Sequence, residues 1–276
     1  MRMPPLIPPP PPPRLTPAEV QRLAYAKSLL ENPGLTARLS NLLGAPIEKG
    51  FKLLPKGWSD AVNKTSRAAL FKALDVAVAT IRARQPRRAS ERFHKLLVGA
   101  SGGIGGAFGL AALALELPIS TTIMLRSIAD IALSEGHDAR ALGTKLACLE
   151  VFALGGRSPS DDAAESSYWA VRAALAKAIS EAASYIAEKG VLEKSAPAVV
   201  RLIGSIATRF GVVVSEQVAA KAVPIVGAAG GSIINVLFMN HFQDMARGHF
   251  IVKGLERKYS LALVRATYES LAIPFR

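Results

Sequence analysis

The sequence has a single cysteine, few charged residues and few aromatic residues. With Cys148 alone among 276 residues, the chain can form neither an internal disulfide nor a thiolate metal cluster. This fits a reducing compartment, and we expect a cytoplasmic protein. Charged residues make up 20% of the chain and aromatic residues 6%, with no array of aromatic side chains on which bases could stack.

Most of the charge that is present is positive. Lys and Arg number 34 against 21 Asp and Glu, which gives a net charge of +13. Such an excess predicts an anionic partner, either phospholipid or nucleic acid. Because the basic residues are dispersed and no zinc-ligand pattern accompanies them, nucleic acid is not favoured as a partner. An anionic membrane surface is the favoured one.

The chain opens on a proline tract. Residues 1–14, MRMPPLIPPPPPPR, lack the apolar segment and cleavage site of a secretory signal, and we expect a disordered polyproline tail. Thr16, Pro17 and Glu19 then supply an N-cap, a first-turn proline and a capping-box glutamate. A helix is therefore predicted to begin near Thr16, and residues 15–276 are expected to form one helical domain.

The rest of the chain is helical in pattern. Leu70 and Leu74 recur at helical spacing within residues 63–84, while Lys64, Arg67 and Lys72 lie elsewhere on that amphipathic helix. Further helices are predicted over the ranges 118–136, 138–154, 160–190, 196–220 and 222–259, with short pieces over 32–60. Pro118 is expected to open one of them and Gly136 to end it. Without sustained apolar-polar alternation, the predicted fold is an all-α, multi-helix bundle.

Glycines four residues apart mark the most apolar part of the chain. Residues 96–115 are an uncharged run of twenty, and its glycines would give a helix a smooth face that another backbone can approach closely. We expect glycine-faced core helices, with these residues in the packing: Gly99, Gly102, Gly103, Gly105, Gly106, Gly109, Gly227 and Gly231. A dinucleotide-binding turn at the same glycines, with Tyr185 and Lys189 as a catalytic pair, is disfavoured because no strands surround it.

A basic segment precedes the apolar run. Six positive side chains form it and are expected to meet anionic headgroups: Arg82, Arg84, Arg87, Arg88, Arg92 and Lys95. A transmembrane helix over residues 96–115 and a core helix of a membrane-associated bundle both stay open. Charged residues soon after the run, such as Glu116 and Arg126, count against full insertion.

Three separated blocks of the sequence resemble the EcsC family. They are GGAFGLAALALELPISTTIMLRSIADIA at residues 105–132, CLEVFALGG at 148–156, and NHFQDMARGHF at 240–250 with LERKY at 255–259. The resemblance implies a bacterial family named for a gene that accompanies an ABC transporter, without an established reaction. A membrane transporter or another membrane protein is the partner it suggests.

Polar residues inside the matching blocks form a candidate centre. They are Glu116, Arg126, Asp130, Glu150, Asn240, His241, Asp244 and Arg247. Two functions follow from the sequence: a non-enzymatic accessory protein at the inner face of the cytoplasmic membrane, or a hydrolase or metal-dependent enzyme that uses Glu116, His241 and Asp244. We favour the first, with no cofactor and no resident metal, because no catalytic motif is recognisable.

Overall fold

The computed structural model describes residues 14–31, 35–44, 46–79, 109–155, 167–189, 193–223 and 227–272. Regular structure in these ranges is helical, and none of their residues lies in a β-strand, which confirms the all-α prediction. The described helices are α1 (Pro17–Glu31), α2 (Leu35–Leu43), α3 (Glu48–Phe51), α4 (Trp58–Ala79), α6 (Gly109–Ser134), α7 (Leu142–Glu150), α8 (Ser167–Lys189), α9 (Pro197–Ala222), α10 (Gly227–Lys258) and α11 (Leu261–Ser270). A 3-10 turn, η2 (Val151–Ala153), follows α7.

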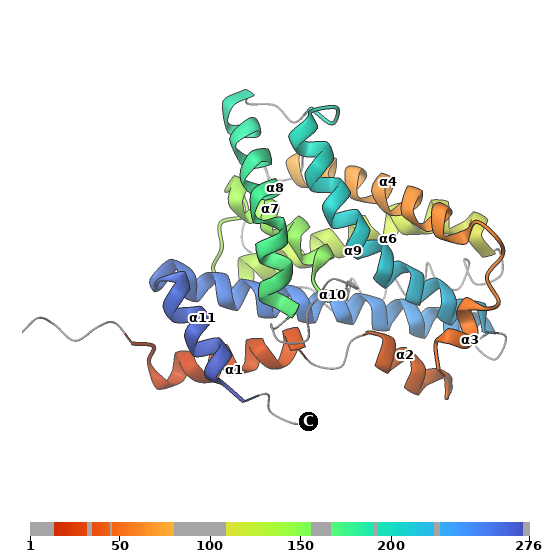
Figure 1. The fold of residues 1–276 in the computed structure, drawn as a ribbon, viewed down its shortest axis with the longest axis horizontal. Helices are drawn as coiled ribbons and strands as arrows, with labels where there is room; N and C mark the ends of the chain where they lie inside the picture. The colour runs from red at the N-terminus through yellow and green to blue at the C-terminus, as the bar shows by residue number, and fades with distance from the viewer. Residues whose placement is uncertain are drawn as a thin grey trace, which may run out of the picture.

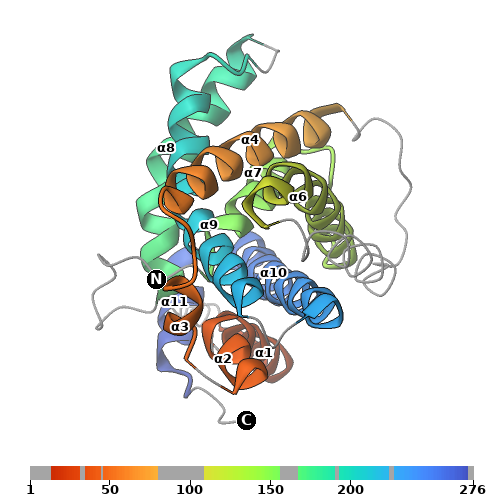
Figure 2. The ribbon, with the colours of Figure 1, turned by 90° about the vertical axis from the view of Figure 1, so that its right-hand side faces the viewer.

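Helix α10 is the central element. It lies along the long axis of the molecule, with α1 below it and α6 and α9 above it in Figure 1. Figure 2 shows the same neighbours around α10 from its end. Phenylalanines from η2, α9 and α10 fill the core beside it, where Phe152 and Phe242 lie 5.4 Å apart between ring centroids and Phe210 and Phe242 lie 5.6 Å apart. All three side chains are fully buried.

Side-chain hydrogen bonds show how α10 is oriented against α6. Asn235 donates to Glu116 at 2.8 Å, and Gln243, eight residues further along α10, donates at 2.8 Å to Ser127, eleven residues further along α6. The two helices therefore run in the same direction. Helix α1 runs the opposite way, because Glu19 near its start contacts Lys258 at the end of α10.

Helix α9 lies between α4 and α8 (Figure 1). Its residue Gly211 faces Asn63 of α4 and Gly204 faces Arg67, so α4 and α9 are antiparallel. Arg201 of α9 pairs with Glu181 of α8, the helix that precedes it. Among the described helices, α9 is the one long and apolar enough to span a membrane, but half of its most apolar window is buried in the protein, as in many core helices.

Two helix ends confirm the sequence analysis. Thr16 and Glu19 form the capping box, in which the Thr16 amide donates to the Glu19 carboxylate at 2.9 Å. Helix α6 ends at Ser134, and Gly136 beyond it has a φ of +79°, a conformation that favours glycine. The amphipathic helix predicted over residues 63–84 overlaps α4, and its apolar residues Leu70 and Leu74 are buried.

One expectation about a helix end is wrong, and one helix was not predicted. Pro118 does not open a helix but lies inside α6, where its missing amide leaves the carbonyl of Ala114 free; Ala114 is exposed, so water can satisfy that carbonyl. The sequence analysis also missed α11. Its N-cap Ser260 accepts a hydrogen bond from the Leu263 amide at 3.2 Å, which is a recognisable start signal.

Candidate functional site

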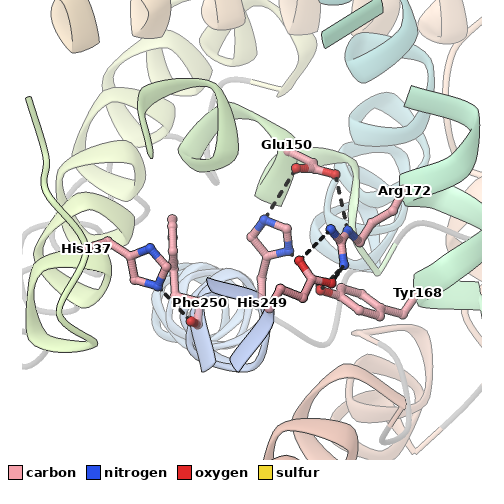
Figure 3. Close-up of polar contacts among 7 residues, drawn as sticks. His137, Glu150, Tyr168, Arg172, His249 and Phe250 are labelled. Carbon is pink, nitrogen blue, oxygen red and sulfur yellow. Dashed lines mark hydrogen bonds and ion pairs between the residues drawn. The ribbon is translucent and has the colours of Figure 1, made fainter. Parts of the chain in front are cut away.

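Helices α7, α8 and α10 bring five polar side chains together in the interior (Figure 3). Tyr168 and Arg172 are four residues apart and share one face of α8. His249 and Glu256 are seven residues apart and share one face of α10. Glu150, the last residue of α7, completes what we call the α7–α8–α10 network.

His249 lies at the middle of this network. Its Nδ1 is 3.1 Å from the Tyr168 hydroxyl, and its Nε2 is 3.4 Å from a carboxylate oxygen of Glu150. Burial lowers the pKa of His249 below its ordinary value, and the nearby Glu150 carboxylate opposes this without reversing it. The imidazole is thus neutral at physiological pH. Tyr168 then donates to Nδ1, and Nε2, which carries the hydrogen, has no hydrogen-bond partner among the described residues.

Glu150 stays ionised although it is buried. Burial alone would raise the pKa of its carboxyl, but His249, Lys253 and Arg172 more than offset that effect and hold the pKa below its usual value. Burial raises the pKa of the Tyr168 hydroxyl, which stays protonated and able to donate. Tyr168 therefore donates to His249, whereas Nε2 of His249 lies 3.4 Å from Glu150 without a hydrogen bond to it.

Arg172 supplies the positive charge of the network. It makes a bidentate pair with Glu256, at 2.6 and 3.0 Å, and its guanidinium carbon lies 4.9 Å from the centre of the Trp169 ring. Burial would lower the pKa of Arg172, but Tyr168 and Glu256 raise it overall. The guanidinium is therefore permanently charged and fixes the relative position of α8 and α10.

The network joins helices and is closed to substrate in this conformation. Tyr168, His249 and Glu150 are 2%, 0% and 4% exposed. A tyrosine, a histidine and a carboxylate in this order resemble a proton relay, but a catalytic group must reach the atom on which it acts. The geometry instead supports a buried polar clamp between α7, α8 and α10.

A second buried histidine lies on the other side of α10. His137, just after α6, contacts the Phe250 carbonyl through Nε2 at 2.8 Å, and its ring packs against the Phe250 ring (Figure 3). Burial lowers the pKa of His137 to about 4. His137 is therefore neutral at physiological pH, and Nε2 carries the hydrogen that it donates to the carbonyl.

The predicted polar centre is divided among separate groups of contacts. Glu116 accepts hydrogen bonds from Lys221 at 2.7 Å and from Asn235 at 2.8 Å, where α6, α9 and α10 meet. Asp244 pairs with Arg38 of α2 at 3.0 Å. Glu116 and Asp244, two of the three residues proposed for an enzyme, thus have different partners.

The other members of the predicted centre are also dispersed. Arg247 pairs with Glu135 at 3.3 Å, while Glu150 belongs to the α7–α8–α10 network. Arg126 is exposed, and Asp130 and Asn240 are half-buried. His241 is buried, and its pKa is lowered to about 4, by burial first and then by the charge of Arg38.

The described residues do not gather a metal site. Nowhere in these ranges do three His, Cys, Asp or Glu side chains approach closely enough to hold a metal ion. Cys148 is buried, and burial raises the pKa of its thiol to about 12, so the group is a protonated core residue rather than a ligand.

Most of the predicted packing glycines and the whole basic segment lie outside the described residues. This applies to Gly99, Gly102, Gly103, Gly105 and Gly106, and to Arg82, Arg84, Arg87, Arg88, Arg92 and Lys95. Gly109 begins α6, Gly227 begins α10, and Gly231 is buried. Close packing at glycine instead occurs at Gly50, where an added Cβ would clash with the Ala219 carbonyl, and at Gly248, where it would lie 3.0 Å from the Ala26 carbonyl.

Sequence reasoning missed most of the α7–α8–α10 network. Of its five members only Glu150 was selected, although His249 lies in the same block as His241 and Asp244. The spacing of Tyr168 and Arg172 and that of His249 and Glu256 were available signals. Their meeting depends on how α8 packs on α10, which helical periodicity does not determine.

Apolar side chains are exposed where α6 and α10 begin. Leu115 and Ile119 are 75% and 50% exposed and, four residues apart, lie on one face of α6. On α10, Ile233 is 48% exposed, but it lies two residues from Asn235, which bonds to Glu116, so the two side chains leave α10 in different directions. We call Leu115 and Ile119, which flank Glu116 where α6 meets α10, the α6–α10 apolar face.

The described part of the chain is an all-α bundle with a long central helix and a buried polar clamp. The model of the EcsC protein family matches residues 20–253, and the chain belongs to this family. Searches of the curated proteins and of the solved structures found no match.

Proposed function

We propose that the chain is a non-enzymatic accessory protein that attaches to the anionic inner face of the cytoplasmic membrane. The observation that carries this proposal is the α6–α10 apolar face. Leu115 ends the uncharged run of residues 96–115, so the exposed face of α6 continues an apolar sequence that begins before the helix. Exposed apolar side chains grouped in this way are typical of surfaces that meet lipid or another protein.

The charge distribution supports lipid as the partner. The segment from Arg82 to Lys95 leads directly into the apolar run, and the chain carries a net charge of +13. Each Lys or Arg near an anionic surface contributes about 1 kcal/mol to attachment. Charge would bring the protein to the membrane, and burial of Leu115 and Ile119 would hold it there. A membrane transporter is the protein partner that this location suggests.

The enzyme alternative has less support. Glu116 pairs with Lys221 and Asp244 with Arg38, while His241 is buried beside Gly155 and its Nε2 has no hydrogen-bond partner among the described residues. The α7–α8–α10 network holds better-ordered acid and base groups, but it is buried. Neither group offers a reacting atom a place beside it, so we assign no reaction.

Sedimentation with lipid vesicles tests the proposal. The wild-type protein should co-sediment with vesicles that contain phosphatidylglycerol and should bind vesicles of phosphatidylcholine less. Replacing the apolar face, Leu115→Ser with Ile119→Ser, should weaken binding because buried apolar area is lost. Leu53→Ser with Leu261→Ser is the matched control, since both leucines are 53% exposed and lie outside this face.

Equal vesicle binding by the two double variants would mean that the α6–α10 apolar face does not contact the membrane. A wild-type protein that ignores both kinds of vesicle would overturn it.

A further inference from the structure

A groove with basic side chains lies along α9, between α4 and α8. Its volume is about 760 Å³. That volume is within the range of small-molecule sites. Helix α9 contacts both flanking helices, and the three elements are seen together in Figure 1. The groove is lined by Arg67, Ala174, Lys177, Ala178, Glu181, Val200, Arg201, Gly204, Ser205 and Thr208.

Each of the three helices contributes one positive side chain to the groove: Arg67 from α4, Lys177 from α8 and Arg201 from α9. The acid among them, Glu181, is neutralised by Arg201, whose Nε and Nη2 donate to one carboxylate oxygen at 3.1 and 2.9 Å. Within the ranges that the structure describes, neither Arg67 nor Lys177 has an acidic partner within ion-pair distance. The groove therefore keeps two positive charges that the described part of the chain does not neutralise.

The floor of the groove is made of small residues. A Cβ at Gly204 would lie 3.7 Å from Nη2 of Arg67, so the guanidinium extends over the backbone of α9. Ala174 and Ala178, one turn apart on α8, line the opposite side of the groove with small side chains. Ser205 offers an exposed hydroxyl beside Gly204. Charge, hydrogen-bond donors and a shallow apolar floor thus lie within one concavity.

We propose that this groove binds a phosphate-bearing ligand, either a phosphorylated small molecule or the phosphorylated headgroup of a lipid. The planar guanidinium of Arg67 suits two parallel hydrogen bonds to phosphate oxygens, and Lys177 adds a mobile positive charge. The groove is larger than a phosphate ion, and its alanines and Val200 accommodate the organic part of the ligand. The residues that line this groove belong neither to the basic segment nor to the α6–α10 apolar face, so the inference goes beyond the proposed membrane attachment.

Glycerol 3-phosphate is the soluble probe, and its binding is measured by calorimetry or by shifts in NMR spectra. The variant Arg67→Gln with Lys177→Gln should weaken binding by about ten-fold or more, because both positive charges available to the phosphate are removed. The charge-matched control is Lys56→Gln with Arg140→Gln, exposed residues outside the groove and outside α6. The control should bind the probe as the wild type does.

Vesicles of phosphatidic acid present the same phosphate monoester on a lipid. Weaker vesicle binding by the groove variant alone, without measurable binding of glycerol 3-phosphate, identifies a lipid headgroup as the ligand. A groove-dependent loss with the soluble probe identifies a phosphorylated small molecule. Because the soluble probe needs no membrane, this result stands even if the protein does not attach to vesicles.

Ser205→Asp is a second test, since it adds a negative charge to the groove without removing a basic residue. It should weaken binding of whichever probe the wild type binds. The proposal is overturned if the wild type binds neither probe, or if the groove variants and the Lys56/Arg140 control lose binding equally. Circular dichroism and melting temperature establish that each variant is folded.

Discussion

The Tyr168 hydroxyl lies 3.1 Å from Nδ1 of His249, and this contact joins α8 to α10 inside the protein. Both side chains are almost fully buried. A buried imidazole nitrogen that loses its partner has no water to replace it. The stability of the α7–α8–α10 network should therefore depend on one oxygen atom of Tyr168.

Tyr168→Phe should lower the free energy of unfolding by about 1–3 kcal/mol, because it leaves Nδ1 of His249 buried without a donor. Tyr185→Phe is the matched control, since that hydroxyl bonds to Glu193 at an exposed site. The control should change stability by less than about 0.5 kcal/mol. Urea denaturation of the three proteins gives the comparison, and equal stability of the two variants would mean that the buried contact contributes nothing.

Removing the carboxylate that Arg172 binds should have a larger effect. Glu256→Ala leaves the guanidinium with its charge but without its bidentate partner, in a site where Arg172 is 13% exposed. Breaking such a pair costs about 3–5 kcal/mol. Glu269→Ala breaks an exposed pair with Arg265 and should cost at most about 1 kcal/mol. A thermal or urea unfolding series in which both variants match would contradict the role of Arg172 in joining α8 to α10.

Stability should fall as the pH is lowered from about 6.5 towards 4. Burial lowers the pKa values of His137 and His241 to about 4, so between these limits the unfolded chain takes up protons that the folded protein does not. Each histidine contributes a slope of up to about 1.4 kcal/mol per pH unit there. His241→Gln should reduce that slope even if it changes stability at pH 7. An unchanged slope in the variant would show that His241 titrates normally in the folded state.

Gly50 and Gly143 should respond in opposite directions to the same substitution. An added Cβ at Gly50 would clash with the Ala219 carbonyl of α9, whereas at Gly143 in α7 it would meet nothing within 4 Å. Gly50→Ala should cost about 1–3 kcal/mol through forced separation of α3 and α9. Gly143→Ala should stabilise by up to about 1 kcal/mol through helix propensity. Melting temperatures that shift in the same direction would contradict this packing.

The sequence predicted local structure better than it predicted contacts. The capping box at Thr16 and the end of α6 before Gly136 depend on residues close together in the chain, and both are confirmed. Pro118 misled the prediction because a proline that usually opens a helix is tolerated inside α6. The start of α11 at Ser260 was readable from a serine cap but was overlooked.

The candidate site was harder to predict because its members come from distant segments. Tyr168 and His249 are 81 positions apart, and their contact requires α8 to cross α10 at one particular place. Glu116 and Asp244 lie in matching blocks, yet one contacts Lys221 and the other Arg38. The three sequence blocks identified helices that carry the polar residues. Which side chains these residues contact depends on tertiary packing.

Fractionation of cells that produce the full chain tests the proposed membrane attachment most directly. The protein should be recovered in the membrane fraction. High salt should release it if charge at a surface holds it, because screening weakens such attachment, whereas resistance to salt and to alkaline carbonate would indicate apolar insertion. Recovery of the protein in the soluble fraction at low salt, with none in the membrane pellet, would contradict the account.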